Sequence, residues 1–242
     1  MNWETSQNKV LVIAHRGDTK VATENTLSAI ESALKIGVDG VEVDLQITQD
    51  QHVVVFHDEN LIRLAGVKKE IRDCSWTELQ KIPLKNGSRI PSLEDLLDLV
   101  QGRFLINLEL KVFSGHQGHL EKRVGEILKN YPHKETLLFS SFHPLVLHRI
   151  KKLLPIIKTG YLFDKHPLLH RFLIPWINPF SVHPPLSYFL KETASTRRTC
   201  VRRTFVWTVN NEDDMKTCIE YGANGLFTDE PRKLLKLLKQ QK

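Results

Sequence analysis

Three acidic residues lie within apolar segments of the chain. Glu42 and Asp44 are two residues apart in the segment 40–48, and Glu109 stands in the segment 104–110. Residues two apart on a β-strand point to the same side, so Glu42 and Asp44 should face one centre. Three carboxylates in a weakly solvated place repel one another unless a cation lies between them. All-oxygen ligation favours a hard ion, Mg²⁺ or Ca²⁺, over zinc. The alternative is a solvated strand face.

Two histidines and two cationic residues accompany these acids. His15 and Arg16 end one apolar run, His57 ends another, and Lys111 stands two residues after Glu109. Arginine, lysine and a metal ion together can hold a phosphate group. One histidine can then accept the proton of an attacking oxygen, and the other can protonate the leaving oxygen. Alternatively, each histidine is structural, and Lys111 only neutralises Glu109.

The elements that must position these residues are an alternating series of strands and helices. Eight strands are predicted, with a further segment at 53–56 as a hairpin partner of the second. The strands are expected at 10–14, 40–48, 104–110, 136–140, 156–161, 178–182, 203–209 and 225–228. Helices are expected after Asn25 as its cap and at 92–100, 120–130, 144–153, 186–195, 211–221 and 231–239. This alternation predicts a (β/α)₈ barrel, with an open doubly wound sheet as the second choice.

The chain organisation is expected to be one domain over residues 1–242, with an insertion at about 58–91. Barrels of this length commonly form one domain. The insertion follows the hairpin, breaks the alternation and has one short helical piece near 75–81. In a barrel, reactive side chains lie at the carboxyl ends of the strands. The acids, histidines and cations above stand at or near such ends.

Composition excludes some classes of function. The net charge is +6, but without the nine Lys and Arg residues of 197–203 and 232–242 it would be −3. The body of the chain is therefore not basic, and a nucleic-acid partner is not expected. The three cysteines, Cys74, Cys200 and Cys218, form no motif and are expected to be reduced thiols. No signal peptide is evident, which favours a cytoplasmic location.

An ordered set of motifs resembles the glycerophosphodiester phosphodiesterase family over about residues 10–231. The N-terminal motifs are His15-Arg16-Gly17, Glu24-Asn25-Thr26, Gly40-Val41-Glu42-Val43-Asp44, Thr48-Gln49-Asp50, Val55-Phe56-His57-Asp58, Pro91-Ser92-Leu93 and Asn107-Leu108-Glu109-Leu110-Lys111. The C-terminal motifs are Ser140-Ser141-Phe142, Val206-Trp207-Thr208-Val209, Gly222-Ala223-Asn224-Gly225 and Thr228-Asp229. One such motif is weak, whereas the ordered set is specific.

The resemblance implies hydrolysis of a glycerophosphodiester to sn-glycerol 3-phosphate and an alcohol. It implies His15 and His57 as the acid–base pair and a divalent cation held by Glu42, Asp44 and Glu109. Arg16 and Lys111 match phosphate-binding positions, and Trp207 matches an aromatic position near the substrate. In the family, a glycerol hydroxyl of the substrate is thought to attack phosphorus and form a cyclic phosphate that water opens.

Two other functions remain open. A lipid-directed relative, a lysophospholipase D or a phosphoinositide-type phospholipase C, is suggested by the apolar run 168–177 and the basic tail 231–242. A barrel that only binds its ligand is the third possibility, and the full set of His, Glu and Asp residues argues against it. The tail is amphipathic, and packing as the last barrel helix is favoured over contact with a membrane surface. The alcohol group, the preferred ion and the oligomeric state remain open.

Overall fold

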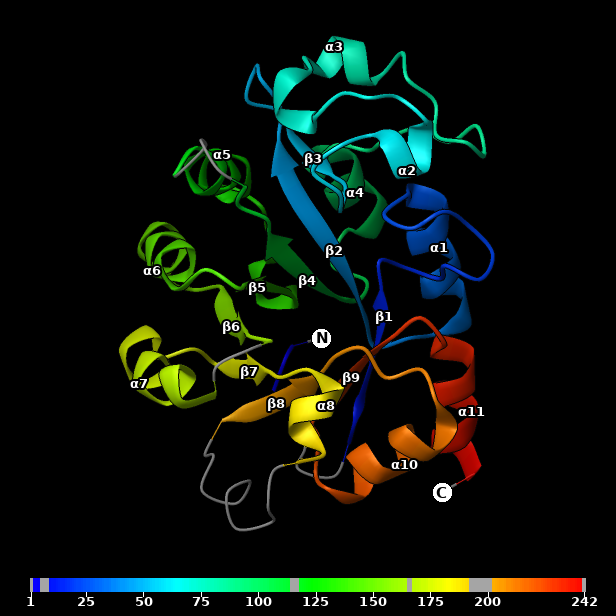
Figure 1. The fold of residues 1–242 in the computed structure, drawn as a ribbon, viewed down its shortest axis with the longest axis vertical. Coiled ribbons are helices and arrows are strands. Elements are labelled where there is room, and N and C mark those ends of the chain that lie inside the picture. The colour runs from blue at the N-terminus through cyan, green and yellow to red at the C-terminus, as the bar shows by residue number, and fades with distance from the viewer. Residues whose placement is uncertain (1, 5–8, 114–117, 165–166, 192–201, 241–242) are drawn as a thin grey trace.

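Eight parallel strands close into a barrel in the computed structural model, which describes residues 2–4, 9–113, 118–164, 167–191 and 202–240 (Figure 1). The strands are β1 (Leu11–His15), β2 (Gly40–Ile47), β3 (Val53–Val55), β4 (Leu105–Leu110), β5 (Leu137–Ser141), β6 (Lys158–Leu162), β7 (Ser181–His183), β8 (Arg203–Val206) and β9 (Gly225–Thr228). The sheet runs β1-β9-β8-β7-β6-β5-β4-β2, and β1 pairs with β2 to close it. β3 pairs antiparallel with β2 as a hairpin. The predicted barrel and its hairpin are confirmed.

Helices cover the outside of this barrel (Figure 1). They are α1 (Leu27–Ile36), α2 (Ile62–Ala65), α3 (Trp76–Leu79), α4 (Leu93–Val100), α5 (His119–Leu128), α6 (Pro144–Leu153), α7 (Pro167–Ile177), α8 (Leu186–Phe189), α10 (Glu212–Glu220) and α11 (Pro231–Gln240), with 3₁₀ turns at Ile71–Asp73 and Lys134–Thr136. Among the described residues, none of the helices is long and apolar enough to cross a bilayer. The run 168–177, to which no helix was assigned from the sequence, lies in α7 between β6 and β7.

Two layers of apolar side chains hold the barrel and its helices together. Val41, Val43 and Leu45 of β2 point outward and pack in the main core between the sheet and the helices. Their neighbours on β2 point inward, as the two-residue period requires. The barrel interior holds a separate cluster near the first residues of β1 and β4, and this cluster includes Trp3 and Phe205. Trp3 is fully buried, and its ring nitrogen donates a hydrogen bond to the carbonyl of Thr136.

The insertion after β3 has a small core of its own. Phe56, Leu61, Ile71, Leu79 and Ile90 are among its buried side chains, and α2, α3 and the first 3₁₀ turn contribute to it. Figure 1 shows this segment, in cyan, standing beyond one end of the hairpin. The segment is therefore folded structure rather than an extended loop, and it starts directly at His57.

Helix boundaries differ from the sequence prediction at two places. Thr26, not Asn25, caps α1, because its hydroxyl accepts the amide proton of Ala29. Asn25 adopts a left-handed φ of 57° and turns its side chain toward β2. α8 ends at Phe189, whereas the expected helix continued to 195, and residues 192–195 lie outside the described part of the chain.

The basic segments and the cysteines can be placed in part. α11 buries Leu234 and Leu237 against the barrel, so the amphipathic tail packs as predicted. Cys74 and Cys218 are buried free thiols. Cys200, Arg197, Arg198 and Lys242 lie outside the described residues.

Candidate active site

The register of three neighbouring strands brings the predicted acids to one end of the barrel. His15 on β1 lies beside Glu42 on β2, and Glu42 lies beside Asn107 on β4. Two residues further along β2, Asp44 lies beside Glu109 on β4. Residues that are paired in the register of parallel strands lie at the same height in the barrel. These side chains therefore enter the barrel in two adjacent layers.

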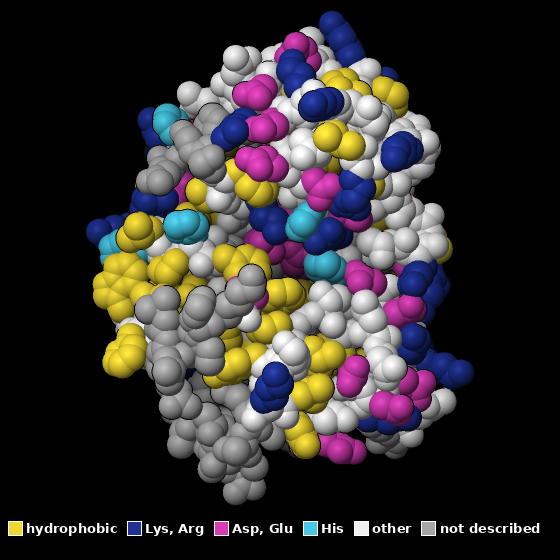
Figure 2. Space-filling view, in the orientation of Figure 1, with side chains coloured by type: hydrophobic (Ala, Val, Ile, Leu, Met, Phe, Trp, Pro, Cys, Tyr) yellow, Lys and Arg dark blue, Asp and Glu magenta, His cyan; other side chains and the backbone are white. Residues whose placement is uncertain are grey.

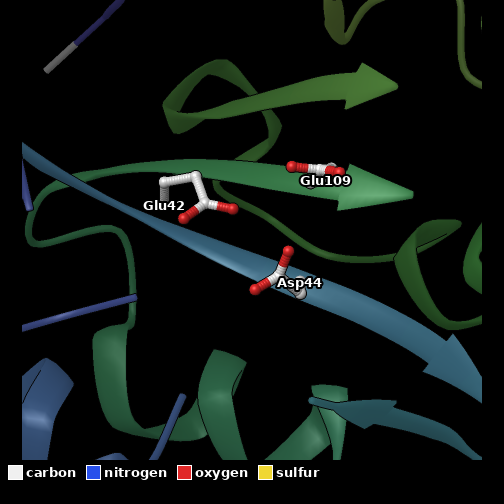
Figure 3. Close-up of side chains that lie close together, drawn as sticks. All are labelled: Glu42, Asp44 and Glu109. Carbon is white, nitrogen blue, oxygen red and sulfur yellow. The ribbon is translucent and has the colours of Figure 1, made fainter. Parts of the chain in front are cut away.

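Glu42, Asp44 and Glu109 form a compact group of acceptor oxygens. Figure 3 shows the first two on β2 and the third on β4, with their carboxylates turned toward a common space. One oxygen of each lies within 4.8 Å of the others, and all three side chains are buried. The buried Glu42 Oε1 has no hydrogen-bond partner among the described residues, and the buried Asp44 Oδ1 and Glu109 Oε1 are approached by the ammonium group of Lys111. Buried carboxylate oxygens with so few donors fit the ligand set of a hard divalent cation.

Cationic side chains partly compensate this acidic group. Lys111 Nζ lies 2.7 Å from Glu109 Oε1 and 3.2 Å from Asp44 Oδ1. Arg16 Nε lies 3.3 Å from the second carboxylate oxygen of Asp44. Glu42 Oε2 accepts a hydrogen bond from the backbone amide of Arg16 at 3.2 Å and lies 3.8 Å from His15 Nε2. Both contacts of Glu42 are made by the same oxygen, Oε2, so its Oε1 is the acceptor with no compensation.

The pKa values follow this arrangement. Burial and the charge of Asp44 raise the pKa of Glu42 to about 8. Burial also raises the pKa of Glu109, although Lys111 opposes it. Burial alone would raise the pKa of Asp44, but the charges of Lys111 and Arg16 outweigh it and the pKa is lowered. The site therefore contains more carboxyl groups than its Lys and Arg side chains can keep ionised at neutral pH.

Each of the two histidines is oriented by an aspartate. His15 Nδ1 lies 2.8 Å from Asp229 Oδ1, and His57 Nδ1 lies 2.8 Å from Asp58 Oδ1. In both cases Nδ1 is bound to the aspartate, so Nε2 is the ring nitrogen left to act. Asp58 therefore orients the ring of its neighbour His57.

The two histidines differ in their pKa. Burial lowers the pKa of His15, but its hydrogen bond to Asp229 and the charge of Glu42 outweigh burial and the net pKa is raised. Burial lowers the pKa of His57, and Lys111 adds to that effect, so the net pKa is lowered. Relative to an ordinary histidine, these contacts favour the protonated form of His15 and the neutral form of His57.

An ion-pair network connects the insertion to the site. Arg63 on α2 donates to both carboxylate oxygens of Asp58, at 2.6 and 3.0 Å, and to both oxygens of Glu24, at 2.8 and 2.7 Å. Glu24 also accepts a hydrogen bond from Arg16 at 2.8 Å. One residue of the insertion thus fixes the partners of both His57 and Arg16. Neither Arg63 nor Glu24 was assigned a role from the sequence.

Asn25 is a further residue whose role the sequence did not reveal. Its side-chain amide donates to Asp44 Oδ2 at 2.8 Å, and its carbonyl accepts the backbone amide of Asp44 at 3.2 Å. This pair of bonds fixes the rotamer of a metal-ligand candidate. Asn25 does stand within the sequence motif Glu24-Asn25-Thr26, but a helix cap was the simpler interpretation of an asparagine at that position.

A cavity of about 180 Å³ opens between these charged residues and an apolar wall. Seven of the eight predicted site residues line it: His15, Arg16, Glu42, His57, Glu109, Lys111 and Trp207. Asp44 is 1% exposed and lies against Arg16 and Lys111. Phe142, Leu162 and Phe227 complete the apolar side. Figure 2 shows this hollow at the centre of the face, with histidine, basic and acidic side chains around it.

Comparison with known proteins gives the family. The model of the glycerophosphoryl diester phosphodiesterase family matches residues 15–233. The chain belongs to this family. Membership makes it a phosphoric diester hydrolase and agrees with the resemblance that the sequence motifs indicated.

Relatives match this chain over nearly its whole length. A glycerophosphodiester phosphodiesterase of Caldanaerobacter subterraneus subsp. tengcongensis is 32% identical, over 96% of this chain and 99% of the relative. A Homo sapiens protein named Lysophospholipase D GDPD1 is 28% identical, over 92% of this chain and 84% of its own.

Solved structures of the family share the barrel. A glycerophosphodiester phosphodiesterase from Thermotoga maritima matches with a TM-score of 0.81 and 32% identity, over 95% of this chain and 98% of the other. An Oleispira antarctica phosphodiesterase in complex with the product sn-glycerol-3-phosphate matches with a TM-score of 0.87 and 26% identity, over 95% and 96%.

Proposed function

We propose that this member of the family hydrolyses glycerophosphodiesters to sn-glycerol 3-phosphate and an alcohol. The observation that carries the proposal is the convergence of two histidines, three carboxylates and two cations on one cavity of about 180 Å³. The structure of the Oleispira antarctica phosphodiesterase in complex with its product sn-glycerol-3-phosphate supports this choice of substrate class.

Glu42, Asp44 and Glu109 are the proposed ligands of a divalent cation, Mg²⁺ or Ca²⁺. The buried, unpartnered Oε1 of Glu42 and its pKa of about 8 both fit a place that a cation stabilises. When bound, such an ion would neutralise negative charge on the phosphoryl oxygens. Arg16 and Lys111, both at the cavity, are the proposed side-chain partners of the remaining phosphate charge.

His57 and His15 are the proposed proton acceptor and donor. His57, with its lowered pKa, takes the proton of the attacking hydroxyl of the substrate's glycerol group. The new P–O bond forms as the P–O bond to the alcohol breaks, and His15, with its raised pKa, gives its proton to the departing oxygen. Water then opens the cyclic phosphate with the two proton transfers reversed. Asp58 and Asp229 keep the two Nδ1 atoms occupied during both steps.

Product analysis tests this function directly. Phosphorus NMR of glycerophosphocholine, glycerophosphoethanolamine and glycerophosphoglycerol, each incubated with the protein and Mg²⁺ or Ca²⁺, should give sn-glycerol 3-phosphate. A transient cyclic phosphate signal should precede it. Product in the presence of excess EDTA would contradict the metal assignment, and a product with phosphate left on the alcohol would contradict the reaction.

A lysophospholipid is a second candidate substrate. The apolar side of the cavity, with Phe142, Leu162, Trp207 and Phe227, favours a diester whose substituent is partly apolar. The human relative named Lysophospholipase D GDPD1 supports it. Side-by-side assay of glycerophosphocholine and lysophosphatidylcholine separates the two, since activity on lysolipids alone would exclude the first candidate.

A further inference from the structure

Exposed apolar side chains are concentrated in one part of this molecule. The described residues include nine large hydrophobic side chains with high exposure, and six of them fall between residues 142 and 180. These six are Phe142, Leu145, Leu153, Ile156, Phe172 and Trp176. Single exposed apolar residues need no explanation, but a group drawn from one short stretch marks an interaction surface.

Five of these residues form what we call the α6–α7 stripe: Leu145, Leu153, Ile156, Phe172 and Trp176. Phe172 and Trp176 are four residues apart on α7 and therefore lie on the same side of that helix. Their exposed fractions are 78% and 51%. The ring of Trp176 stacks on His148 of α6 at 5.2 Å, which joins the two helices into one surface. Figure 2 shows hydrophobic side chains gathered over this region, next to the cavity.

The same stretch of chain is basic. Residues 142–180 contain six Lys and Arg residues and a single acidic residue, Asp164. Arg149 and Lys158 form ion pairs with acids outside the stretch. Lys151 donates to the backbone carbonyl of Asn178, a neutral acceptor, and Lys152 next to it is exposed. The surroundings of the stripe therefore carry positive charge that suits an anionic surface.

The stretch of chain that carries the stripe also reaches the mouth of the cavity. Phe142, at the start of the stretch, is 40% exposed and also lines the cavity. Its ring meets the ring of Trp207 edge to face, with centroids 5.5 Å apart. One exposed apolar residue of this stretch, Phe142, is thus also part of the apolar side of the site.

We propose that the α6–α7 stripe docks this protein on an anionic lipid bilayer, with the cavity mouth at the edge of the contact. Aromatic and aliphatic side chains enter the interface between headgroups and acyl chains, and Lys151 and Lys152 meet anionic headgroups. A bilayer is favoured over a protein partner because the patch is a stripe of large apolar side chains flanked by lysines, with one acidic residue in 39. This surface lies outside the catalytic residues, and the proposal does not depend on which diester is hydrolysed.

Vesicle co-sedimentation of the full chain tests the docking. Wild-type protein should bind vesicles of phosphatidylglycerol and phosphatidylcholine, bind pure phosphatidylcholine vesicles far less, and lose binding at high salt. Phe172→Ser should lower the partition coefficient about tenfold, because a buried phenyl ring is lost from the interface. Lys151→Gln with Lys152→Gln should lower it to a similar degree on anionic vesicles.

Matched variants separate docking from general effects. Val21→Ser, at 61% exposure, removes an apolar side chain elsewhere, and Lys68→Gln with Lys85→Gln removes two exposed charges of the insertion. Both should leave the partition coefficient within about twofold of wild type. All variants should hydrolyse a water-soluble diester at the wild-type rate, so failure of the catalytic proposal is seen separately, as absence of turnover without vesicles.

Three results would overturn the proposal. The first is no binding of wild type to anionic vesicles, and the second is equal loss in the stripe variants and their controls. The third is a concentration-dependent dimer, seen by light scattering, that Phe172→Ser abolishes while no variant affects vesicle binding. That result would assign the stripe to a second copy of the chain. Phe172 is 78% exposed, so its variant keeps the core intact.

Discussion

The two sides of the catalytic cavity are built from different chemistry on one barrel. The side formed by β1, β2 and β4 carries His15, Glu42, Asp44 and Glu109. The rest of the cavity wall presents the apolar side chains of Phe142, Leu162, Trp207 and Phe227. The strand geometry is the same on both sides, so the difference lies in which side chains the chain places at equivalent positions.

The charged side relies on a second row of supporting hydrogen bonds more than the apolar side does. Asp229, Asp58 and Asn25 each hold one charged residue by a hydrogen bond of 2.8 Å. Buried charges are costly unless hydrogen bonds compensate them. On the apolar side the contacts are mainly ring packing, such as that of Phe142 on Trp207, and the Trp207 ring nitrogen donates a hydrogen bond to the carbonyl of His183. We therefore expect substitutions on the charged side to abolish chemistry and those on the apolar side to change selectivity.

The largest effect should follow the loss of either histidine. His15→Ala and His57→Ala should each lower kcat about 10³-fold, because proton transfer by a positioned side chain contributes on that order. The measurement is steady-state hydrolysis of glycerophosphocholine, with thermal unfolding of each variant to show that it is folded. His52→Ala, a histidine 43% exposed by its side chain and outside the cavity, is the control and should stay within about twofold. Equal activity of wild type and His57→Ala would remove the proton-transfer assignment.

The sequence predicted the charged side well because its signals are local. Glu42 and Asp44 are two residues apart within an apolar strand, and that spacing alone places both on one face, which the structure shows to be the inner one. The barrel followed from the alternation of strands and helices, and the observed register then brought Glu109 beside Asp44. Seven of the eight predicted site residues consequently share one cavity.

What the sequence missed depends on contacts between distant residues. Asp229 is 214 residues from His15, and Arg63 is 39 residues from Glu24, so neither pair could be read from spacing. Asn25 looked like a helix cap, a role its residue type favours, but its left-handed φ turns it to Asp44 instead. α7 was missed because its sequence is apolar on most sides and contains Pro175, so no helical period separates one face from another.

The second effect concerns the metal. Glu42→Gln should weaken divalent-ion binding about 100-fold and lower activity with it, whereas folding should be preserved. In the metal-free protein the pKa of Glu42 is about 8 against an ordinary 4.5, so the folded state binds more protons between these values. Stability in chelator should therefore fall as pH rises from 4.5 to 8, and the variant should lose this slope.

Calorimetry and chemical denaturation check this prediction. Titration of Mg²⁺ or Ca²⁺ into the metal-free protein gives the affinity, and unfolding in urea with EDTA at several pH values gives the slope. Glu70→Gln, a partly buried acid of the insertion, is the matched substitution and should leave both quantities unchanged. A variant that unfolds in chelator where wild type stays folded would contradict the placement of Glu42 as a ligand rather than a packing residue.

The third effect lies beneath the apolar side. His183 on β7 is fully buried, and burial lowers its pKa to about 3. Its Nε2 lies 2.8 Å from the hydroxyl of Ser181. The ring fits because residue 160 is glycine, where a Cβ would lie 2.3 Å from Nε2. Since the pKa in the folded state is below the ordinary 6.5, the unfolded chain binds the proton first and stability falls as pH drops below 6.5.

Urea unfolding between pH 7.5 and 5 measures this contribution. The loss from His183 should be about 2 kcal/mol at pH 5, and His183→Gln should show a correspondingly flatter pH dependence. The exposed His52→Gln should keep the wild-type slope. The quantity compared is the slope of the unfolding free energy against pH. The pH-independent loss of stability that comes from replacing a buried ring therefore does not affect it. An unchanged slope in His183→Gln would show that the apolar side does not bury a neutral imidazole.

The smallest effect should come from the rim of the apolar side. Phe142→Ala removes a ring that lines the cavity and packs edge to face on Trp207, an apolar neighbour. We expect kcat/KM to fall about fivefold for a diester with an apolar alcohol and less than about twofold for glycerophosphoglycerol, since the ring contacts the substituent and not the phosphate. Competition between the two diesters in one reaction gives the ratio directly. Leu145→Ala, exposed on α6 and outside the cavity, should leave the ratio unchanged. A loss equal for both diesters would mean that Phe142 supports the charged side after all, and the division of the cavity into a chemical side and a selective side would no longer hold.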